Sequence, residues 1–97
     1  MVYKIETMSL DQLRYFVTVA EEQNLTRAAE KLRLSQPPLT RHIRALEDEL
    51  GVQLFERTPK GMTLLPAGSR LLTLTLPILQ AVAALSDTFA EPKQGVP

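Results

Sequence analysis

The side chains best suited to bind another molecule lie near the start of one predicted helix, residues 36–50. Arg41 can donate two N–H groups to guanine O6 and N7, and Gln36 can pair with adenine, each contributing about 1–3 kcal/mol of base discrimination. Thr40 can donate to a phosphate or contact a thymine methyl group. The spacing of these residues predicts contact with base edges in the DNA major groove, which admits a helix.

Two prolines, Pro37 and Pro38, stand among these polar residues. They offer flat apolar surface to thymine methyl groups, and they also suit the first turn of a helix, where a missing N–H group costs little. Both interpretations stay open for the prolines. Arg41 also has a second interpretation, as a solvated side chain paired with a nearby glutamate.

Three further candidates, Thr26, Arg27 and Ser35, are predicted at helix N-termini. Free N–H groups and the positive end of the helix dipole favour a phosphate there. Capping of the helix would explain these residues equally well, and capping is compatible with a phosphate contact.

The remaining candidates are basic residues farther along the chain. Arg44 can reach distant phosphates, or it can pair with Glu47 or Asp48 about one turn on. Arg57 and Lys60 belong to a predicted hairpin, where they can follow the flanking minor groove or the backbone. The alternative for Arg57 and Lys60 is a solvated hairpin.

Hydrophobic periodicity predicts the helix that carries most of these side chains. At about 100° per residue, its apolar residues fall within roughly 40° of one another and its polar residues face the other way. The predicted buried set is Leu39, Ile43, Leu46 and Leu50. The predicted exposed set is Pro37, Arg41, Arg44 and Asp48. Arg33 and Leu34 form the preceding turn, Ser35 is expected to cap the helix, and Gly51 is expected to end it.

Two shorter helices are predicted before this one. The first has Ser9 as its N-cap and apolar residues at helical spacing as far as about Gln23. The second is expected to use Thr26 as its N-cap and to bury Ala28, Ala29 and Leu32. Two adjacent alanines permit the close helix approach that a helix-turn-helix requires.

The chain after Gly51 is predicted to form a hairpin and then a long helix. Residues 52–57 and 62–65 are the expected strands, joined by a turn, and a hairpin in this place is a wing. The final helix begins at Pro66, reaches about Phe89 and is expected to bend at Pro77. The predicted fold is mainly α: a winged helix-turn-helix with a three-helix core and a two-stranded wing, followed by a long linker helix.

The final helix holds more apolar residues than one face against the preceding domain can bury. A homodimer through two paired long helices would cover the excess, because a two-fold axis lets the same surface meet itself. The alternative is that this helix folds back entirely on its own domain.

Composition excludes several classes of protein. The 97 residues contain no cysteine and one histidine, so a disulfide framework is absent and a metal site is not expected. No apolar run reaches the roughly 20 residues of a membrane span, and no signal peptide is recognised, so we expect a cytoplasmic protein without a membrane partner. Catalytic motifs such as G-x-S-x-G, H-E-x-x-H or a glycine-rich phosphate loop are also missing. We therefore expect neither an enzyme nor a cofactor.

The charge is unevenly distributed along the chain. The formal net charge is zero, but residues 26–70 hold eight basic side chains against five acidic ones, a local net charge of +3. Residues 1–25 have a net charge of −2 and residues 71–97 of −1. A basic central segment is compatible with a nucleic-acid partner, although an ordinary mixed surface would also explain it.

Several ordered motifs resemble one known family. The segments AAEKL, SQPPLTRHIRALEDELG and LFER, followed by TLLPAG, are similar to the N-terminal DNA-binding domain of LysR-type transcriptional regulators. The resemblance covers about residues 8–90. It implies a winged helix-turn-helix and a linker helix that pairs antiparallel with that of a partner, in regulators that are commonly tetrameric when full length. Two features depart from the family: Leu65 stands where a threonine usually caps the linker helix, and residues 1–7 precede the usual start.

The resemblance also implies roles for individual positions. Base contacts fall on Gln36, Pro37, Thr40 and Arg41, with support from Thr26, Ser35 and Arg57. The implied segments are an N-terminal extension (1–8), the DNA-binding domain (9–65), the linker and dimerisation helix (66–90) and the start of a hinge (91–97). A C-terminal domain that binds a small-molecule effector is expected beyond them, so that the chain would be a fragment or a truncated regulator.

Two functions follow as hypotheses. The first is sequence-specific binding of double-stranded promoter DNA by a dimer, with one recognition helix in each half of a partly palindromic site. The second is a winged-helix interaction module that has lost DNA contact and serves as a dimerisation scaffold. The polar and basic face formed by Gln36, Thr40, Arg41 and Arg44 favours the first hypothesis.

Overall fold

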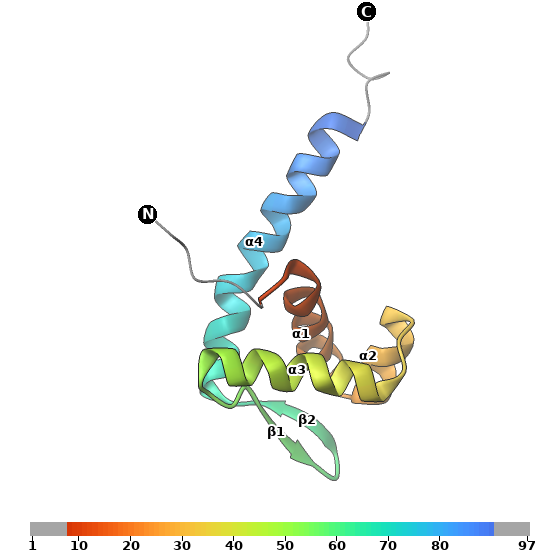
Figure 1. The fold of residues 1–97 in the computed structure, drawn as a ribbon, viewed down its shortest axis with the longest axis vertical. Coiled ribbons are helices and arrows are strands. Elements are labelled where there is room, and N and C mark those ends of the chain that lie inside the picture. The colour runs from red at the N-terminus through yellow and green to blue at the C-terminus, as the bar shows by residue number, and fades with distance from the viewer. Residues whose placement is uncertain (1–7, 91–97) are drawn as a thin grey trace, which may run out of the picture.

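The computed structural model describes residues 8–90, where four helices and one two-stranded antiparallel sheet follow one another along the chain (Figure 1). The helices are α1 (Leu10–Glu22), α2 (Leu25–Leu32), α3 (Gln36–Leu50) and α4 (Pro66–Ala90). The strands are β1 (Phe55–Thr58) and β2 (Gly61–Leu64). The predicted fold, a three-helix core with a wing and a long last helix, is confirmed. Predictions for residues 1–7 and 91–97 lie outside the described residues.

Helix α1 begins and ends at the predicted residues. Ser9 Oγ accepts from Gln12 N at 3.1 Å, and Gln12 Oε1 accepts from Ser9 N at 3.3 Å, which forms a reciprocal capping box. Gln23 closes the helix in the left-handed region with φ 56°, and its N–H donates to the Val19 carbonyl. The carbonyl of Gln23 also accepts a hydrogen bond from the wing.

Helix α2 begins earlier than predicted, and Thr26 is not its N-cap. The cap is Asn24, whose side-chain oxygen accepts from Arg27 N at 2.9 Å. An asparagine is at least as good a cap as a threonine, and this choice adds Leu25 to the helix, where it packs against the core. Thr26 therefore lies in the first turn.

The turn before α3 and both ends of α3 lie at the predicted residues. Arg33 ends α2 in the left-handed region at φ 59°, and Gly51 ends α3 at φ 71° with its N–H bonded to the Glu47 carbonyl at 2.8 Å. Ser35 is the N-cap residue of α3, as expected. Its side chain makes no capping hydrogen bond, however, so that part of the prediction is wrong.

The three helices pack around one apolar core, with α3 lying across α1 and α2 (Figure 1). The fully buried large apolar residues of this core are Phe16, Val19, Leu39, Leu46 and Leu54. Phe16 also meets Phe55 of the wing, with ring centroids 5.4 Å apart. The prediction that Leu50 is buried is wrong, because it is 37% exposed at the last turn of α3, where it lines a surface hollow beside α4.

The wing consists of β1, β2 and the turn between them. Phe55 pairs with Leu64 and Thr58 pairs with Gly61 in antiparallel register. The first strand is shorter than predicted, since residues 52–54 are outside it: the N–H groups of Val52 and Leu54 donate to Glu47 instead of to a strand. The second strand is shifted by one residue from the predicted 62–65.

The wing is fixed to the end of α1. Met62 N donates to the Gln23 carbonyl at 3.1 Å. Gly61 has φ 135°, and a Cβ atom at this position would overlap the same carbonyl oxygen. Only glycine fits here without moving the wing.

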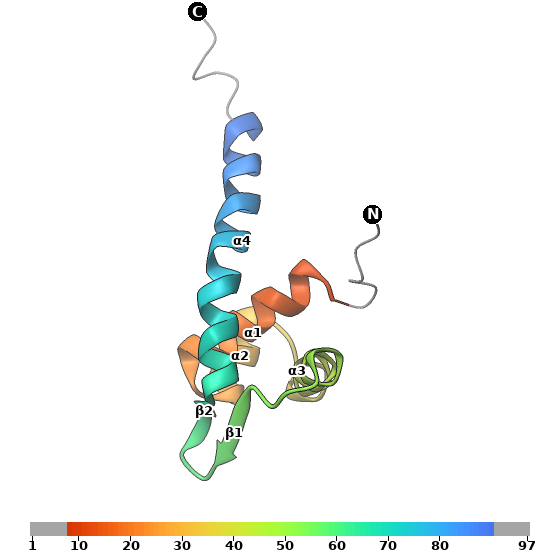
Figure 2. The same cartoon turned by 90° about the vertical axis from the view of Figure 1, so that its left-hand side faces the viewer.

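Helix α4 starts against the headpiece (residues 8–65) and then extends away from it (Figures 1 and 2). Leu65 N donates to the Leu54 carbonyl at 2.9 Å, and a Cβ atom at Gly68 would overlap that carbonyl oxygen. The helix remains one element through Pro77. By length and composition alone, α4 is apolar enough to cross a membrane, although its first part contacts α1 and β2.

Candidate nucleic-acid interface

Every candidate residue predicted from the sequence has an accessible side chain. Nine are exposed and two, Pro38 and Thr40, are half-buried. The exposed ones are Thr26, Arg27, Ser35, Gln36, Pro37, Arg41, Arg44, Arg57 and Lys60. They come from the N-terminal turns of α2 and α3, the middle of α3, and the wing. The folded chain therefore leaves the predicted binding face open while Leu39, Ile43 and Leu46 of α3 are buried.

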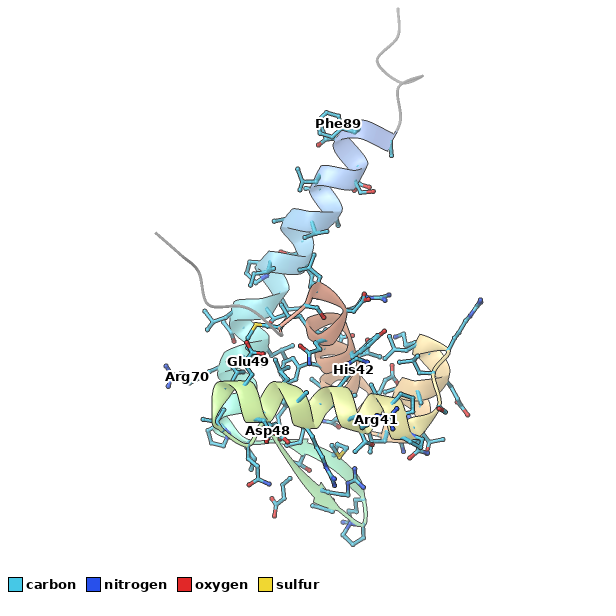
Figure 3. All side chains as sticks on the ribbon, in the orientation of Figure 1. Arg41, His42, Asp48, Glu49, Arg70 and Phe89 are labelled. Atoms are coloured by element: carbon cyan, nitrogen blue, oxygen red, sulfur yellow. The ribbon has the colours of Figure 1, made fainter. Side chains whose placement is uncertain are left out.

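The starts of α2 and α3 meet at Gln36. Its amide nitrogen Nε2 donates to Thr26 Oγ1 at 2.9 Å, which joins two residues ten positions apart in the sequence. The amide oxygen and the second N–H of Gln36 are not used in this bond, so both atoms needed to pair with an adenine are retained. Arg41 follows on the stretch of α3 nearest to α2 (Figure 3).

Backbone donors for a phosphate are few at the start of α3. Helix N-termini normally offer several free N–H groups, but Pro37 and Pro38 have none. At α2, the N–H of Arg27 is already bonded to the Asn24 side chain. Phosphate contacts at these two helix starts would therefore depend more on side chains than the sequence analysis assumed.

The wing places basic side chains beside both helices. A pocket between α3 and the wing is lined by Thr40, Arg44, Glu47 and Arg57, together with apolar residues. A second, more open hollow lies between the N-cap and first turn of α2 (residues 24–26) and residues 57–62 of the wing, which include Lys60. Arg57 lines both hollows, so the two hollows adjoin and bring residues of α2, α3 and the wing together.

Arg44 does not form the ion pair with Glu47 or Asp48 that one interpretation of the sequence allowed. Neither of the two ion pairs within residues 8–90 involves Arg44; they join Arg14 to Asp11 and Lys31 to Glu22. Glu47 Oε2 accepts instead from Leu54 N at 2.8 Å and Phe55 N at 3.4 Å. Arg44 is left exposed beside the pocket.

Sequence reasoning missed three features of this surface. Asn24 was not considered as a cap, although its residue type and its position three before Arg27 fit one. The bond between Gln36 and Thr26 and the role of Glu47 depend on tertiary contacts that no local pattern reports. His42, also on α3, is half-buried, and its ring centroid lies 5.0 Å from that of Tyr15.

No group of three or more potential metal ligands occurs within residues 8–90. The chemistry available at the surface is therefore that of arginine, lysine, amide and hydroxyl donors. These are the groups that contact DNA phosphates and base edges.

Comparisons with known proteins agree on one family. A family model described as bacterial regulatory helix-turn-helix protein, lysR family, matches residues 10–69. The transcriptional regulator ClcR of Pseudomonas putida is 57% identical over 65 residues, which are 67% of this chain and 22% of ClcR. BudR of Klebsiella aerogenes is 45% identical over 89 residues, or 92% of this chain and 59% of BudR. The chain thus spans about a fifth of ClcR and over half of BudR.

Solved structures show the same arrangement of elements. The DNA-binding domain of BenM in complex with catB site 1 DNA has a TM-score of 0.83 and 40% identity, covering 92% of this chain and all of that one. Full-length CbnR has a TM-score of 0.80 and 42% identity, covering 87% of this chain and 29% of CbnR.

Proposed function

Because the chain belongs to the LysR family of bacterial helix-turn-helix regulators, we propose that it binds double-stranded promoter DNA in a transcriptional regulator. The observation that carries the proposal is the two-sided α3. Leu39, Ile43 and Leu46 hold one side in the core, while Gln36 and Arg41 are exposed on the helix. A recognition helix needs this combination of a fixed side and a polar side.

The candidate residues divide by the kind of contact they would make. Gln36, Pro37, Pro38, Thr40 and Arg41, near the start of α3, are proposed to face base edges, as residues at the start of a recognition helix do. The proposed backbone contacts come from Thr26, Arg27, Ser35, Arg44, Arg57 and Lys60. Backbone contacts set orientation and affinity, whereas base contacts set sequence preference.

Helix α4 supports a homodimer as the DNA-binding unit. Its exposed apolar residues are Leu74, Leu76, Ile78, Val82, Leu85 and Phe89, and they continue to the end of the helix farthest from the headpiece (Figure 3). Pairing of two α4 helices would remove these side chains from water and place two α3 helices on one DNA site. The site is therefore proposed to be partly palindromic.

Longer relatives extend the proposal to a whole regulator. In that setting we expect a tetramer in the bacterial cytoplasm, with a small-molecule effector bound in a C-terminal domain.

Fluorescence anisotropy of labelled double-stranded DNA, carrying a site selected from a random pool, tests the function. Arg41→Ala should reduce the preference for that site over a scrambled duplex by about tenfold or more, because one arginine–guanine pair provides about 1–3 kcal/mol. Arg70→Ala is the matched control, since Arg70 belongs to α4 and lies near the C-terminal end of α3, away from Arg41 (Figure 3). A wild-type chain that binds no duplex at low salt would refute the proposal.

A further inference from the structure

One acidic residue lines the pocket between α3 and the wing. Glu47 is on α3, one turn after Arg44 and Ile43, and it lines the same pocket as Arg44 and Arg57. A carboxylate near DNA phosphates is repelled by them, so its presence needs an explanation other than direct backbone contact. Its hydrogen bonds provide that explanation.

Glu47 holds the chain that leads into the wing. Its Oε2 accepts from Leu54 N at 2.8 Å and, more weakly, from Phe55 N at 3.4 Å. Its backbone carbonyl also accepts from Gly51 N at 2.8 Å and Val52 N at 3.2 Å. Glu47 therefore accepts from four backbone N–H groups between Gly51 and Phe55, and its side chain reaches the first residue of β1.

The position of Arg57 follows from this attachment. Phe55 and Arg57 are two residues apart on β1, so they share one face of the strand, and both line the pocket against α3. The other strand is fixed separately, by Met62 N at the Gln23 carbonyl. Glu47 thus fixes the β1 side of the wing to α3, and Gln23 fixes the β2 side to α1.

We infer that Glu47 is a positioning residue for DNA binding, which holds the wing so that Arg57 lies beside Thr40 and Arg44 of α3. The inference rests on the proposed DNA-binding function. It assigns Glu47 no contact with DNA. A glutamate can also accept from cytosine N4, and the experiment distinguishes that role.

The test compares Glu47→Gln with Glu47→Met in the 97-residue chain, each with and without Arg57→Ala. Both variants lose the same charge and have similar length, but only glutamine keeps an oxygen that can accept from Leu54 N. The readout is the slope of log Kd against log salt on the selected DNA site. Glu56→Gln, on the opposite face of β1 from Arg57, controls for loss of one negative charge.

In the wild type and in Glu47→Gln, Arg57→Ala should lower the salt slope by about one, as expected for one lost phosphate contact. In Glu47→Met, the same change should alter the slope by less than about 0.3, because Arg57 is no longer held near the backbone. A full Arg57 effect in Glu47→Met would overturn the inference. So would a changed base preference in Glu47→Gln, since that would place the carboxylate on a base.

Amide hydrogen exchange provides a second readout that needs no DNA. The Leu54 N–H should exchange about tenfold faster in Glu47→Met than in Glu47→Gln, while Met62 N–H should exchange equally in both. Equal exchange at Leu54 would overturn the inference. If Glu47→Met does not fold, Glu47→Asp, which is one methylene too short, should give the same loss of protection. If the wild type does not bind DNA, the proposed function is refuted. The exchange experiment would still show whether Glu47 holds the wing.

Discussion

The headpiece and the outer part of α4 leave opposite kinds of side chain in water. In the headpiece, α3 buries Leu39 and Leu46 completely and exposes Gln36 and Arg41. In α4, the large apolar side chains exposed from residue 76 onward range from 37% exposure at Leu76 to 80% at Phe89. The apolar core of the headpiece is buried, with Leu71 and Leu72 of α4 packed against it, whereas the outer part of α4 has an apolar surface that stays exposed within the described residues 8–90.

This difference separates two tasks that a DNA-binding dimer must perform. A polar face on a fixed scaffold suits contact with DNA, where hydrogen bonds and charge dominate. An apolar helix surface suits contact with another copy of itself, where burial of apolar area dominates. The following predictions test whether the two regions are energetically as distinct as their surfaces.

The largest contrast should appear when one leucine is truncated in each region. Leu39→Ala should lower the free energy of unfolding by about 3 kcal/mol, because Leu39 is fully buried. Leu85→Ala, at a side chain that is 63% exposed, should lower it by less than about 0.5 kcal/mol in the monomer. Urea unfolding at low protein concentration measures both. Similar losses in the two variants would contradict the contrast.

The proposed pairing of two α4 helices is tested by introducing a charge on the apolar surface of α4. Leu85→Glu should weaken the dimer by about two orders of magnitude, because two copies of a leucine contact are lost in a symmetric interface. Sedimentation equilibrium measures the dissociation constant. Ser86→Glu adds the same charge one residue on, at an exposed polar position, and should change it much less. A wild-type chain that stays monomeric at several hundred micromolar would remove the dimer from the account.

The junction between the two regions is sensitive to a single methyl group. Gly68→Ala should destabilise the protein by about 1–3 kcal/mol despite the better helix propensity of alanine, because the new Cβ would overlap the Leu54 carbonyl oxygen. Ser69→Ala, at the exposed neighbouring position, reports the helix propensity alone. Thermal unfolding compares the two. A stabilised Gly68→Ala variant would mean that α4 moves easily on the headpiece.

The smallest effect concerns a buried hydroxyl in α4. Thr75 is fully buried, and its Oγ1 has no hydrogen-bond partner within the described residues 8–90. Thr75→Val should leave stability unchanged or raise it by about 1 kcal/mol, since the shape is kept and an unpaired polar group is removed. The control is Thr73→Val, because the Thr73 hydroxyl is exposed and donates to the Ser69 carbonyl at 3.1 Å. Destabilisation by Thr75→Val alone would show that its hydroxyl has a partner.

The sequence was sufficient for features that depend on local periodicity. The two faces of α3 were predicted because its apolar residues repeat at helical spacing, and Gly51 was predicted to end it because glycine adopts the left-handed conformation readily. The prediction that Leu50 is buried was wrong, because periodicity assigns a residue to a helix face without showing where the core ends. Asn24 and Thr26 are both good N-caps, and the choice between them depended on the packing of Leu25.

Features that join distant segments could not be predicted. Glu47 was interpreted as a possible partner of Arg44, since the two are one helical turn apart. In the folded chain its carboxylate binds the backbone at Leu54 instead. The position of the wing depends on such contacts between distant segments. The observed limits of the two strands differ from the predicted limits for the same reason. The candidate residues of the proposed DNA-binding face could be named from the sequence, but their arrangement in space required the fold.

Selection of bound sequences from a random DNA pool, by the wild type and by Arg41→Ala, tests the central claim that the exposed side of α3 reads bases. The wild type should enrich a motif of two symmetry-related half-sites. Arg41→Ala should lose the preference at one or two positions in each half-site and retain the others, because a single arginine contacts a single base pair or its neighbour. Enrichment of an unchanged motif by Arg41→Ala, or of no motif by the wild type, would contradict the account.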